Sequence, residues 1–161
     1  MKVEARLAER GLALPSPMRV DTTVRLPFAN VRVSGTRVYI SGHAPLNPDG
    51  TLAHPLGKVG LDVTVEEGYI AAQKTALAML ASLKRELGNL DLITAWLRVF
   101  GMVNVAPDFR VMPAVINGAS DLILDLYGPE IGSHARSAVG LAGLPFNIPV
   151  EIEAEVEIAA S

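Results

Sequence analysis

The chain has 161 residues and no cysteine, and its 14 basic and 17 acidic residues give a formal net charge of −3. A chain of this length fits one domain with a single core, and without cysteine it has no disulfide, no thiolate nucleophile and no cysteine metal site. No basic stripe is available to follow a phosphate backbone, so nucleic acid is not expected as the main partner.

The N-terminal segment predicts a short helix and an extended lead-in. Apolar residues recur at helical spacing between charges over residues 3–12, and Gly11 ends the pattern. The chain up to Pro27 holds three prolines and scattered apolar residues, which is typical of extended structure. No apolar run approaches the roughly 18 residues of a membrane span, so we expect a cytoplasmic protein without a membrane segment. We expect one domain over residues 1–161, in which 1–27 form the helix and lead-in.

A β-hairpin and a long helix follow. Residues 31–40 (VRVSGTRVYI) are two β-branched runs around a Ser-Gly-Thr turn, the pattern of a hairpin whose second strand ends at Ser41-Gly42. Thr64 and Glu67 have the spacing of a capping box, and the helix that they start is predicted to end at Gly88. Its apolar stripe is narrow and rich in alanine, so the helix can lie close to a sheet. The stripe consists of Tyr69, Ala72, Ala76, Leu80, Leu83 and Leu87.

A long strand and a second helix occupy the middle of the chain. Residues 93–105 (ITAWLRVFGMVNV) have the length and aromatic content of a buried strand. Pro113 marks the first turn of a helix, because proline is tolerated there and not further in. The helix is predicted to continue until Gly128-Pro129.

The last quarter of the chain predicts two strands. Over residues 150–158 apolar side chains alternate strictly with four glutamates, so this strand has one apolar and one acidic face. Residues 135–141 form another run of mostly small, apolar residues, and Gly143 and Pro145 separate the two runs. We expect two neighbouring strands joined by a turn.

The order of the elements predicts an α+β fold with one mixed sheet and the two long helices on one face. The chain is 50% hydrophobic and only 19% charged, with a mean hydropathy of +0.33, whereas typical soluble domains have roughly 25% charged residues. No further helix is left to cover the other face of the sheet. We therefore expect an oligomer in which a symmetric copy covers that face.

Arg136 is the only charged residue in the first of the two C-terminal runs. A buried guanidinium needs an anion, because leaving it unpaired costs several kcal/mol. One candidate is a glutamate on the next strand, which would make a structural ion pair. The other is the carboxylate of a ligand, which the planar guanidinium can bind through two charge-assisted hydrogen bonds.

The other polar candidates also have purely structural interpretations. Glu151 shares its face with three further glutamates, and any of the four can be a solvated charge. Asn117 can be a packing amide within its helix, and Ser41-Gly42 can be a plain strand end. The three histidines lack the spacing of metal ligands, so we expect no metal site. They are His43, His54 and His134, of which His134 lies two residues from Arg136 and can flank a cleft.

Six motifs occur in the order of a known family. They are Ser41-Gly42, Asn117, Ala135-Arg136-Ser137, Val139, Leu144-Pro145 and Val150-Glu151-Ile152-Glu153-Ala154. Together they resemble the reactive-intermediate deaminases, the Rid or YjgF family, over roughly residues 28–158. The N-terminal helix and the segments GKVG and INGASDL resemble a longer YjgF-like branch whose members are often labelled endoribonucleases.

The resemblance implies a chorismate-mutase-like fold and a homotrimer whose sheets form a central barrel, with ligand clefts between subunits. In the family, the arginine at the place of Arg136 binds the carboxylate of a 2-imino acid, which is hydrolysed to a 2-keto acid and ammonia without a cofactor. The glutamate at the place of Glu151 holds the attacking water. The resemblance further implies a substrate-binding role for Phe28, Ser41, Gly42, Asn117 and Ala138.

Two positions depart from the family pattern. Leu26-Pro27-Phe28 stands where many members have Gly-Pro-Tyr, so a hydroxyl is missing and the cleft becomes more apolar. Ala138 stands where a cysteine often follows Arg-Ser. Two function classes remain open: hydrolysis of a small carboxylate-bearing imine or enamine, and a trimeric module that only binds a ligand or acts as a chaperone. A third interpretation, a ribonuclease, is less favoured because the sequence lacks the basic groove that this function needs.

Overall fold

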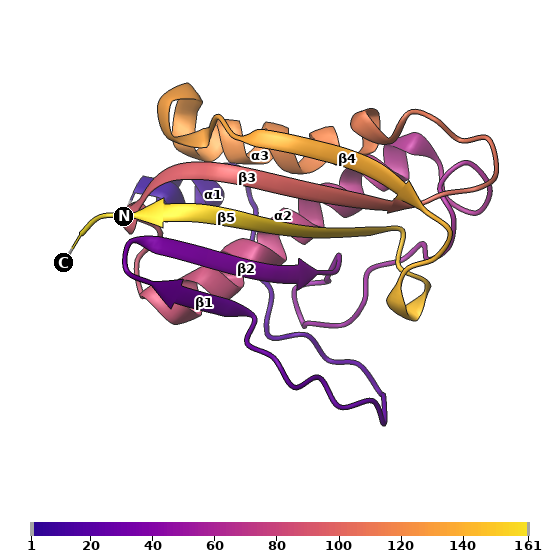
Figure 1. Cartoon of the computed structure of the whole chain (residues 1–161), viewed down its shortest axis with the longest axis horizontal. Coiled ribbons are helices and arrows are strands. Elements are labelled where there is room, and N and C mark those ends of the chain that lie inside the picture. Colours follow the sequence, from indigo (N-terminus) through magenta and orange to yellow (C-terminus); the bar gives the residue numbers. More distant parts are fainter. Residues whose placement is uncertain (1, 161) are drawn as a thin grey trace.

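The computed structural model describes residues 2–160, which form one β-sheet and three α-helices (Figure 1). Two short 3-10 helices, η1 and η2, lie in the connections. In chain order the elements are α1 (Lys2–Glu9), β1 (Val31–Ser34), β2 (Arg37–His43), α2 (Val65–Leu87), η1 (Leu90–Leu92), β3 (Ile93–Asn104), α3 (Met112–Gly132), β4 (Ala135–Leu141), η2 (Pro145–Asn147) and β5 (Val150–Ile158).

The five strands form a mixed sheet in the order β1-β2-β5-β3-β4. All neighbours are antiparallel except β3 and β4, which are parallel. The expectation that the strands 135–141 and 150–158 are neighbours joined by a turn is wrong, because β3 lies between them. A parallel pair needs a long crossover instead of a tight turn. Helix α3 is that crossover, and it carries β4 to the edge of the sheet.

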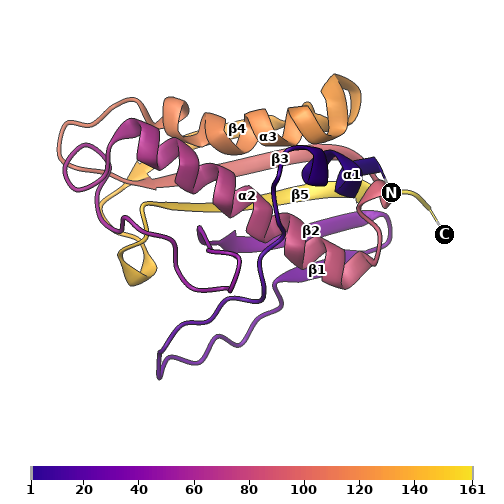
Figure 2. The ribbon, with the colours of Figure 1, turned by 180° about the vertical axis from the view of Figure 1, so that it is seen from behind.

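All three helices lie on one face of the sheet, which Figure 2 shows from the helix side. The opposite face carries no helix within residues 2–160. The core lies between the layers, where Leu80 of α2, Ile116 of α3 and Val99 of β3 are fully buried. These observations confirm the predicted α+β class with two long helices on one face. None of the helices in the described chain has the length and apolar composition needed to cross a membrane.

The narrow apolar stripe predicted for α2 is wrong. Most of the helix from Ala71 to Leu83 is buried, including Ala78 and Ser82, which lie outside the stripe. The reason is a second, smaller apolar cluster on another side of the helix, where Ala78 contacts the loop after β2 and the segment before β5.

The ends of α2 are confirmed, and the helical backbone of α3 is interrupted at its predicted end, Gly128. The Thr64 hydroxyl accepts from the Glu67 amide, the Glu67 carboxylate accepts from the Thr64 amide, and Gly88 is left-handed with a φ of 76°. Gly128 has a φ of 77° and a ψ of 172°, so the helix that begins at Met112 stops there, and a separate helical turn that begins at Pro129 extends the element to Gly132. Proline suits that place, because the first turn of a helix does not use its N–H.

Candidate functional site

The two predicted catalytic residues lie on opposite faces of the sheet. Arg136 of β4 pairs in register with Val99, a fully buried residue, and so faces the helices. Glu151 of β5 pairs with Met102 and alternates with buried neighbours, so it faces the uncovered side. One copy of the chain therefore does not bring Arg136 and Glu151 together.

Two side chains of α3 hold the Arg136 guanidinium. Its Nη1 atom donates to Asn117 Oδ1 at 2.8 Å and to Ser120 Oγ at 3.1 Å. No Asp or Glu of residues 2–160 forms an ion pair with Arg136. The interpretation of Arg136 as the ion-pair partner of a strand glutamate is therefore wrong, because the glutamates of β5 lie on the other face. The two neutral acceptors orient the guanidinium and leave its charge available to a ligand anion.

Ser120 is in turn held by His134. His134 Nδ1 lies 2.7 Å from the Gly132 carbonyl oxygen and therefore carries the hydrogen, while Nε2 lies 2.9 Å from Ser120 Oγ. We call this set the arginine cluster: Asn117, Ser120, His134 and Arg136. Sequence reasoning placed His134 only at the flank of a cleft and missed Ser120. The spacing of Asn117 and Ser120 by three residues on one helix face could have revealed it.

A β-bulge at the end of β2 places Gly42 over Glu151. The ladder between β2 and β5 shifts between Ile40 and His43, where β2 has one extra residue. A Cβ atom on Gly42 would lie 2.6 Å from Glu151 Oε2. Only glycine therefore lets the carboxylate lie this close to the backbone.

The Glu151 carboxylate is half-buried and has no cationic partner within the described residues. Burial raises the pKa of the Glu151 carboxyl, and the neighbouring Glu153 raises it further. A carboxylate with a raised pKa binds a proton more readily, which suits it to take a proton from water.

Glu151 and Gly42 border a cavity of about 310 Å³ that lies between the end of β2, the start of β5 and α2. We call it the glutamate cavity. Its size is that of a site for a small molecule. Apolar side chains around it remain exposed, which is typical of a ligand or partner surface. They are Met18 (40% exposed), Leu26 (43%), Phe28 (56%) and Phe146 (36%).

The segment before β5 forms one wall of this cavity with a strained backbone. Phe146, which lines the cavity, and Asn147, which follows it, both have a φ of 58°. A left-handed conformation costs a residue other than glycine roughly 1 kcal/mol. Such strain persists where the surrounding structure fixes it, and it recurs at ligand sites.

Helix α2 contributes a second chain of hydrogen bonds to the glutamate cavity. His43 Nδ1 lies 2.6 Å from the Ser41 carbonyl oxygen and Nε2 lies 2.8 Å from Ser82 Oγ, to which Arg85 Nη2 donates at 2.9 Å. Burial lowers the pKa of His43 and the charge of Arg85 adds to this shift, against the opposing Ser41 carbonyl. The Nε2 atom of the neutral imidazole therefore accepts a hydrogen bond from the Ser82 hydroxyl. Sequence reasoning missed Ser82 and Arg85, although their i, i+4, i+7 spacing with Ala78 marks a second face of α2.

Ser41 and Ala138 do not line the glutamate cavity. Ser41 Oγ donates to the Ala29 carbonyl oxygen at 2.7 Å and so ties the lead-in to β2 next to Phe28. Ala138 packs against the core on the same side of β4 as Arg136.

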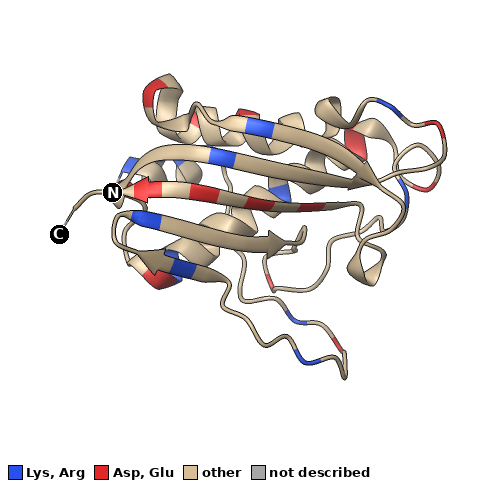
Figure 3. Ribbon diagram, in the orientation of Figure 1, with Lys and Arg blue, Asp and Glu red and all other residues tan. Residues whose placement is uncertain are grey.

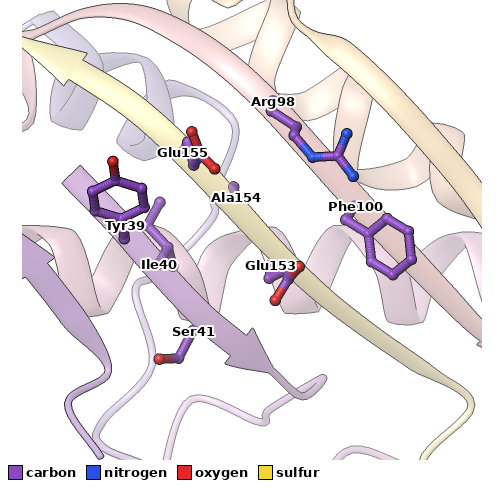
Figure 4. A pocket seen from close by; sticks show the side chains of 8 residues that line it. All are labelled: Tyr39, Ile40, Ser41, Arg98, Phe100, Glu153, Ala154 and Glu155. Atoms are coloured by element: carbon purple, nitrogen blue, oxygen red, sulfur yellow. The ribbon is translucent and has the colours of Figure 1, made fainter. Parts of the chain in front are cut away.

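The uncovered face of the sheet has a shallow pocket of about 230 Å³ and a row of acidic residues along β5 (Figures 3 and 4). The Arg98 guanidinium lies 5.5 Å from the centroid of the Phe100 ring on this face. The acidic row would repel a phosphate backbone. Within residues 2–160 no group of three or more His, Asp or Glu side chains is arranged to hold a metal ion.

Comparisons with known proteins match nearly the whole chain. The family model described as "YjgF/chorismate_mutase-like, putative endoribonuclease" matches residues 4–153. Protein TCP17 of Trypanosoma cruzi is 38% identical over 157 residues, which cover 98% of this chain and 94% of that protein. A crystal structure of Atu1372, a protein of unknown function from Agrobacterium tumefaciens, is 40% identical in sequence. The match covers 98% of this chain and 92% of that chain, with a TM-score of 0.85. A "putative endoribonuclease" from Shewanella oneidensis MR-1 is 30% identical, covers 98% of this chain and 100% of that chain, and has a TM-score of 0.88.

Proposed function

Because the chain belongs to the YjgF/chorismate-mutase-like family, we propose that it hydrolyses 2-imino or enamine acids to 2-keto acids and ammonia. The observation that carries the proposal is the pair of incomplete half-sites. The arginine cluster presents a guanidinium without a carboxylate partner, and the glutamate cavity presents a carboxylate that forms no ion pair within the described residues. For a substrate with one carboxylate and one electrophilic carbon, Arg136 suits the carboxylate and Glu151 suits the activation of a water at that carbon.

The two half-sites act on one substrate if they come from different copies of the chain. We propose a homotrimer in which the edge formed by β4 and α3 of one copy faces the glutamate cavity of the next. The position of β4 at the edge of the sheet and the exposed apolar residues around the cavity support this arrangement. The uncovered sheet faces would then meet in a central barrel.

In this cleft Arg136 holds the substrate carboxylate through two parallel hydrogen bonds, which places C2 beside Glu151. Glu151 takes a proton from a water molecule, the water oxygen bonds to C2, and the electron pair of the C=N bond moves to nitrogen. Protonated Glu151 then returns a proton to that nitrogen. Glu151 then takes the proton of the C2 hydroxyl and passes it to the nitrogen as the C–N bond breaks. The bonding pair stays on nitrogen, ammonia leaves, the C2 oxygen becomes the keto oxygen, and Glu151 is again a carboxylate. Such acid–base catalysis contributes roughly 10²- to 10⁴-fold.

The other predicted residues support these two groups in the proposal. Asn117 orients Arg136, and Gly42 leaves room for the Glu151 carboxylate. Phe28 packs against the apolar part of the substrate, and Ser41 holds the lead-in that carries Phe28. Ala138 contributes the backbone of β4 beside Arg136. No cofactor takes part.

A coupled assay tests this function. An amino-acid oxidase generates 2-imino acids in solution, and the rates of keto-acid and ammonia formation are measured with and without the protein. We expect a faster reaction with the wild-type protein and none of this acceleration with Arg136→Ala or Glu151→Gln. Equal rates with and without the wild-type protein would overturn the proposal.

A trimeric module that binds a ligand or acts as a chaperone without chemistry is the second candidate. Phe28 favours it, because a phenyl ring supplies no proton to the reaction. Saturable binding of a carboxylic acid without any rate acceleration would support this candidate. The ribonuclease activity named for the relative from Shewanella oneidensis fits the acidic row on β5 poorly, and an RNA-cleavage assay with Glu151→Gln as control examines it directly.

A further inference from the structure

A cation lines the glutamate cavity from the side of α2. Arg85 donates to Ser82 Oγ at 2.9 Å and to the Pro15 carbonyl oxygen at 3.4 Å. Both acceptors are neutral, and no carboxylate in the described part of the chain forms an ion pair with Arg85. A guanidinium has five N–H donors, so Arg85 keeps donors and its charge for a ligand.

The Arg85 side chain is exposed, and its guanidinium donates to a buried hydrogen-bond chain that orients it. Ser82 is 5% exposed and His43 is 9% exposed, and the Ser41 carbonyl oxygen anchors the imidazole. Because His43 accepts a hydrogen bond from the Ser82 hydroxyl, the lone pairs of the Ser82 oxygen point toward Arg85. Arg136 is held by the same order of groups in the arginine cluster, namely carbonyl, histidine and serine. Each half-site therefore holds one arginine in a fixed orientation.

The carboxylate at the cavity does not neutralise this cation. Glu151 forms no ion pair with Arg85, and its raised pKa reflects burial and Glu153 with no cation offsetting them. The cavity thus combines apolar walls, a carboxylate beside Gly42 and an uncompensated guanidinium on α2. Apolar walls with one oriented cation suit a ligand that has a methylene chain ending in an anion.

We propose that Arg85 binds a terminal carboxylate on the substrate side chain, so that the preferred substrates are dicarboxylic 2-imino acids with a methylene chain between the two ends. This inference rests on the proposed function, in which Arg136 of another copy holds the C1 carboxylate and Glu151 faces C2. The side chain is then the remaining substituent of C2, and the cavity of about 310 Å³ beside Glu151 is the space that it enters. Arg85 determines specificity and does not touch the reacting atoms.

Calorimetric titration with two stable keto acids of equal chain length, 2-oxoadipate and 2-oxohexanoate, tests the inference without turnover. The wild-type protein is expected to bind the dicarboxylate roughly ten- to a hundredfold more tightly, which is the range for one charge-assisted contact. Arg85→Gln should bind both acids alike, and Arg85→Lys should keep part of the preference because it keeps the charge. Arg110→Gln is the matched control, since Arg110 is exposed beside Asp108 and does not line the cavity.

Three outcomes would overturn the inference: equal affinity of the wild-type protein for both acids, no measurable binding of 2-oxoadipate, or a preference that persists in Arg85→Gln. Different results distinguish a failure of the proposed function from a failure of this inference. If no 2-imino acid is hydrolysed faster but the Arg85-dependent preference remains, the cavity is a dicarboxylate-binding site without chemistry. If apolar and dicarboxylic imines are hydrolysed equally well and Arg85→Gln changes neither rate, the function stands and this inference falls.

Discussion

Arg136 carries a charge that neutral acceptors orient and that no carboxylate of residues 2–160 pairs with. We expect Arg136→Ala to lower imine hydrolysis by roughly a hundredfold or more, the value of a lost bidentate contact. The free energy of unfolding should fall by only about 1 kcal/mol, since Asn117 and Ser120 lose one donor. A buried ion pair would cost about 3 to 5 kcal/mol instead. Thermal melts and coupled-assay rates measure the two effects.

Arg136→Lys separates the two interpretations further. Lysine keeps the charge but cannot make the two-pronged bond to a carboxylate. The variant should therefore melt near the wild-type temperature and still hydrolyse imines at least roughly tenfold more slowly. A large drop in melting temperature with unchanged activity would contradict a ligand role for Arg136.

The ionised Glu151 carboxylate is expected to be required for activity and to lower the stability of the fold. Because its pKa is raised in the folded protein above the ordinary 4.5, the folded state binds a proton more readily than the unfolded state. Stability therefore falls as pH rises from about 4.5 through the raised pKa, and the full cost is present above it. Glu151→Gln should abolish hydrolysis and raise the melting temperature at pH 7, with a gain that shrinks toward pH 4.5.

Melting curves of both proteins across this pH range measure the effect. Glu130→Gln, at an exposed position near the end of α3, controls for the loss of one negative charge. A melting temperature of Glu151→Gln that lies below the wild type at pH 7 would show that the carboxylate stabilises the fold.

At the level of elements, the bulge in β2 makes the glutamate cavity possible. A Cβ on Gly42 would meet Glu151 Oε2 at 2.6 Å, and a flexible side-chain end can move away at little cost. Gly42→Ala should therefore change the free energy of unfolding by less than about 1 kcal/mol but lower activity by roughly ten- to a hundredfold, because the catalytic carboxylate is displaced. Gly143→Ala is the matched control, since a Cβ there meets nothing within 4 Å. Equal activities of the two variants would count against the placement of Glu151.

The contact between α2 and α3 depends on a different glycine. A Cβ on Gly118 would lie 2.0 Å from the Tyr69 carbonyl oxygen, and backbone cannot move aside as a side-chain end can. We expect Gly118→Ala to lower the free energy of unfolding by about 2 to 3 kcal/mol. Denaturant unfolding measures the loss, and a value within the error of the wild type would show that the helices can separate without cost.

The whole molecule is expected to work as a homotrimer. Three features lack a partner within the described chain: the helix-free face of the sheet, the exposed apolar residues around the glutamate cavity, and the two separate half-sites. Sedimentation velocity or light scattering should give three times the 17.1 kDa mass of one chain. A clean monomer at micromolar concentration would remove the basis for a cleft between copies.

The sequence by itself determined the elements and the two catalytic candidates. Strict alternation predicts β5, the capping box and Gly88 delimit α2, and the family motifs single out Arg136 and Glu151. These signals are local, because a period of two, a helix cap and a short motif depend only on residues close in the chain. The α+β class followed from their order.

Only the tertiary structure decided strand order, the partner of Arg136 and the lining of the glutamate cavity. The crossover by α3 separates β4 from β5, which excludes an ion pair between Arg136 and the glutamates. The bulge turns His43 toward α2, where it meets Ser82. A shift of one residue in a ladder exchanges the faces of every side chain beyond it, and packing between distant segments decides where that shift falls. For this reason local pattern could not reveal Arg85 as part of the site.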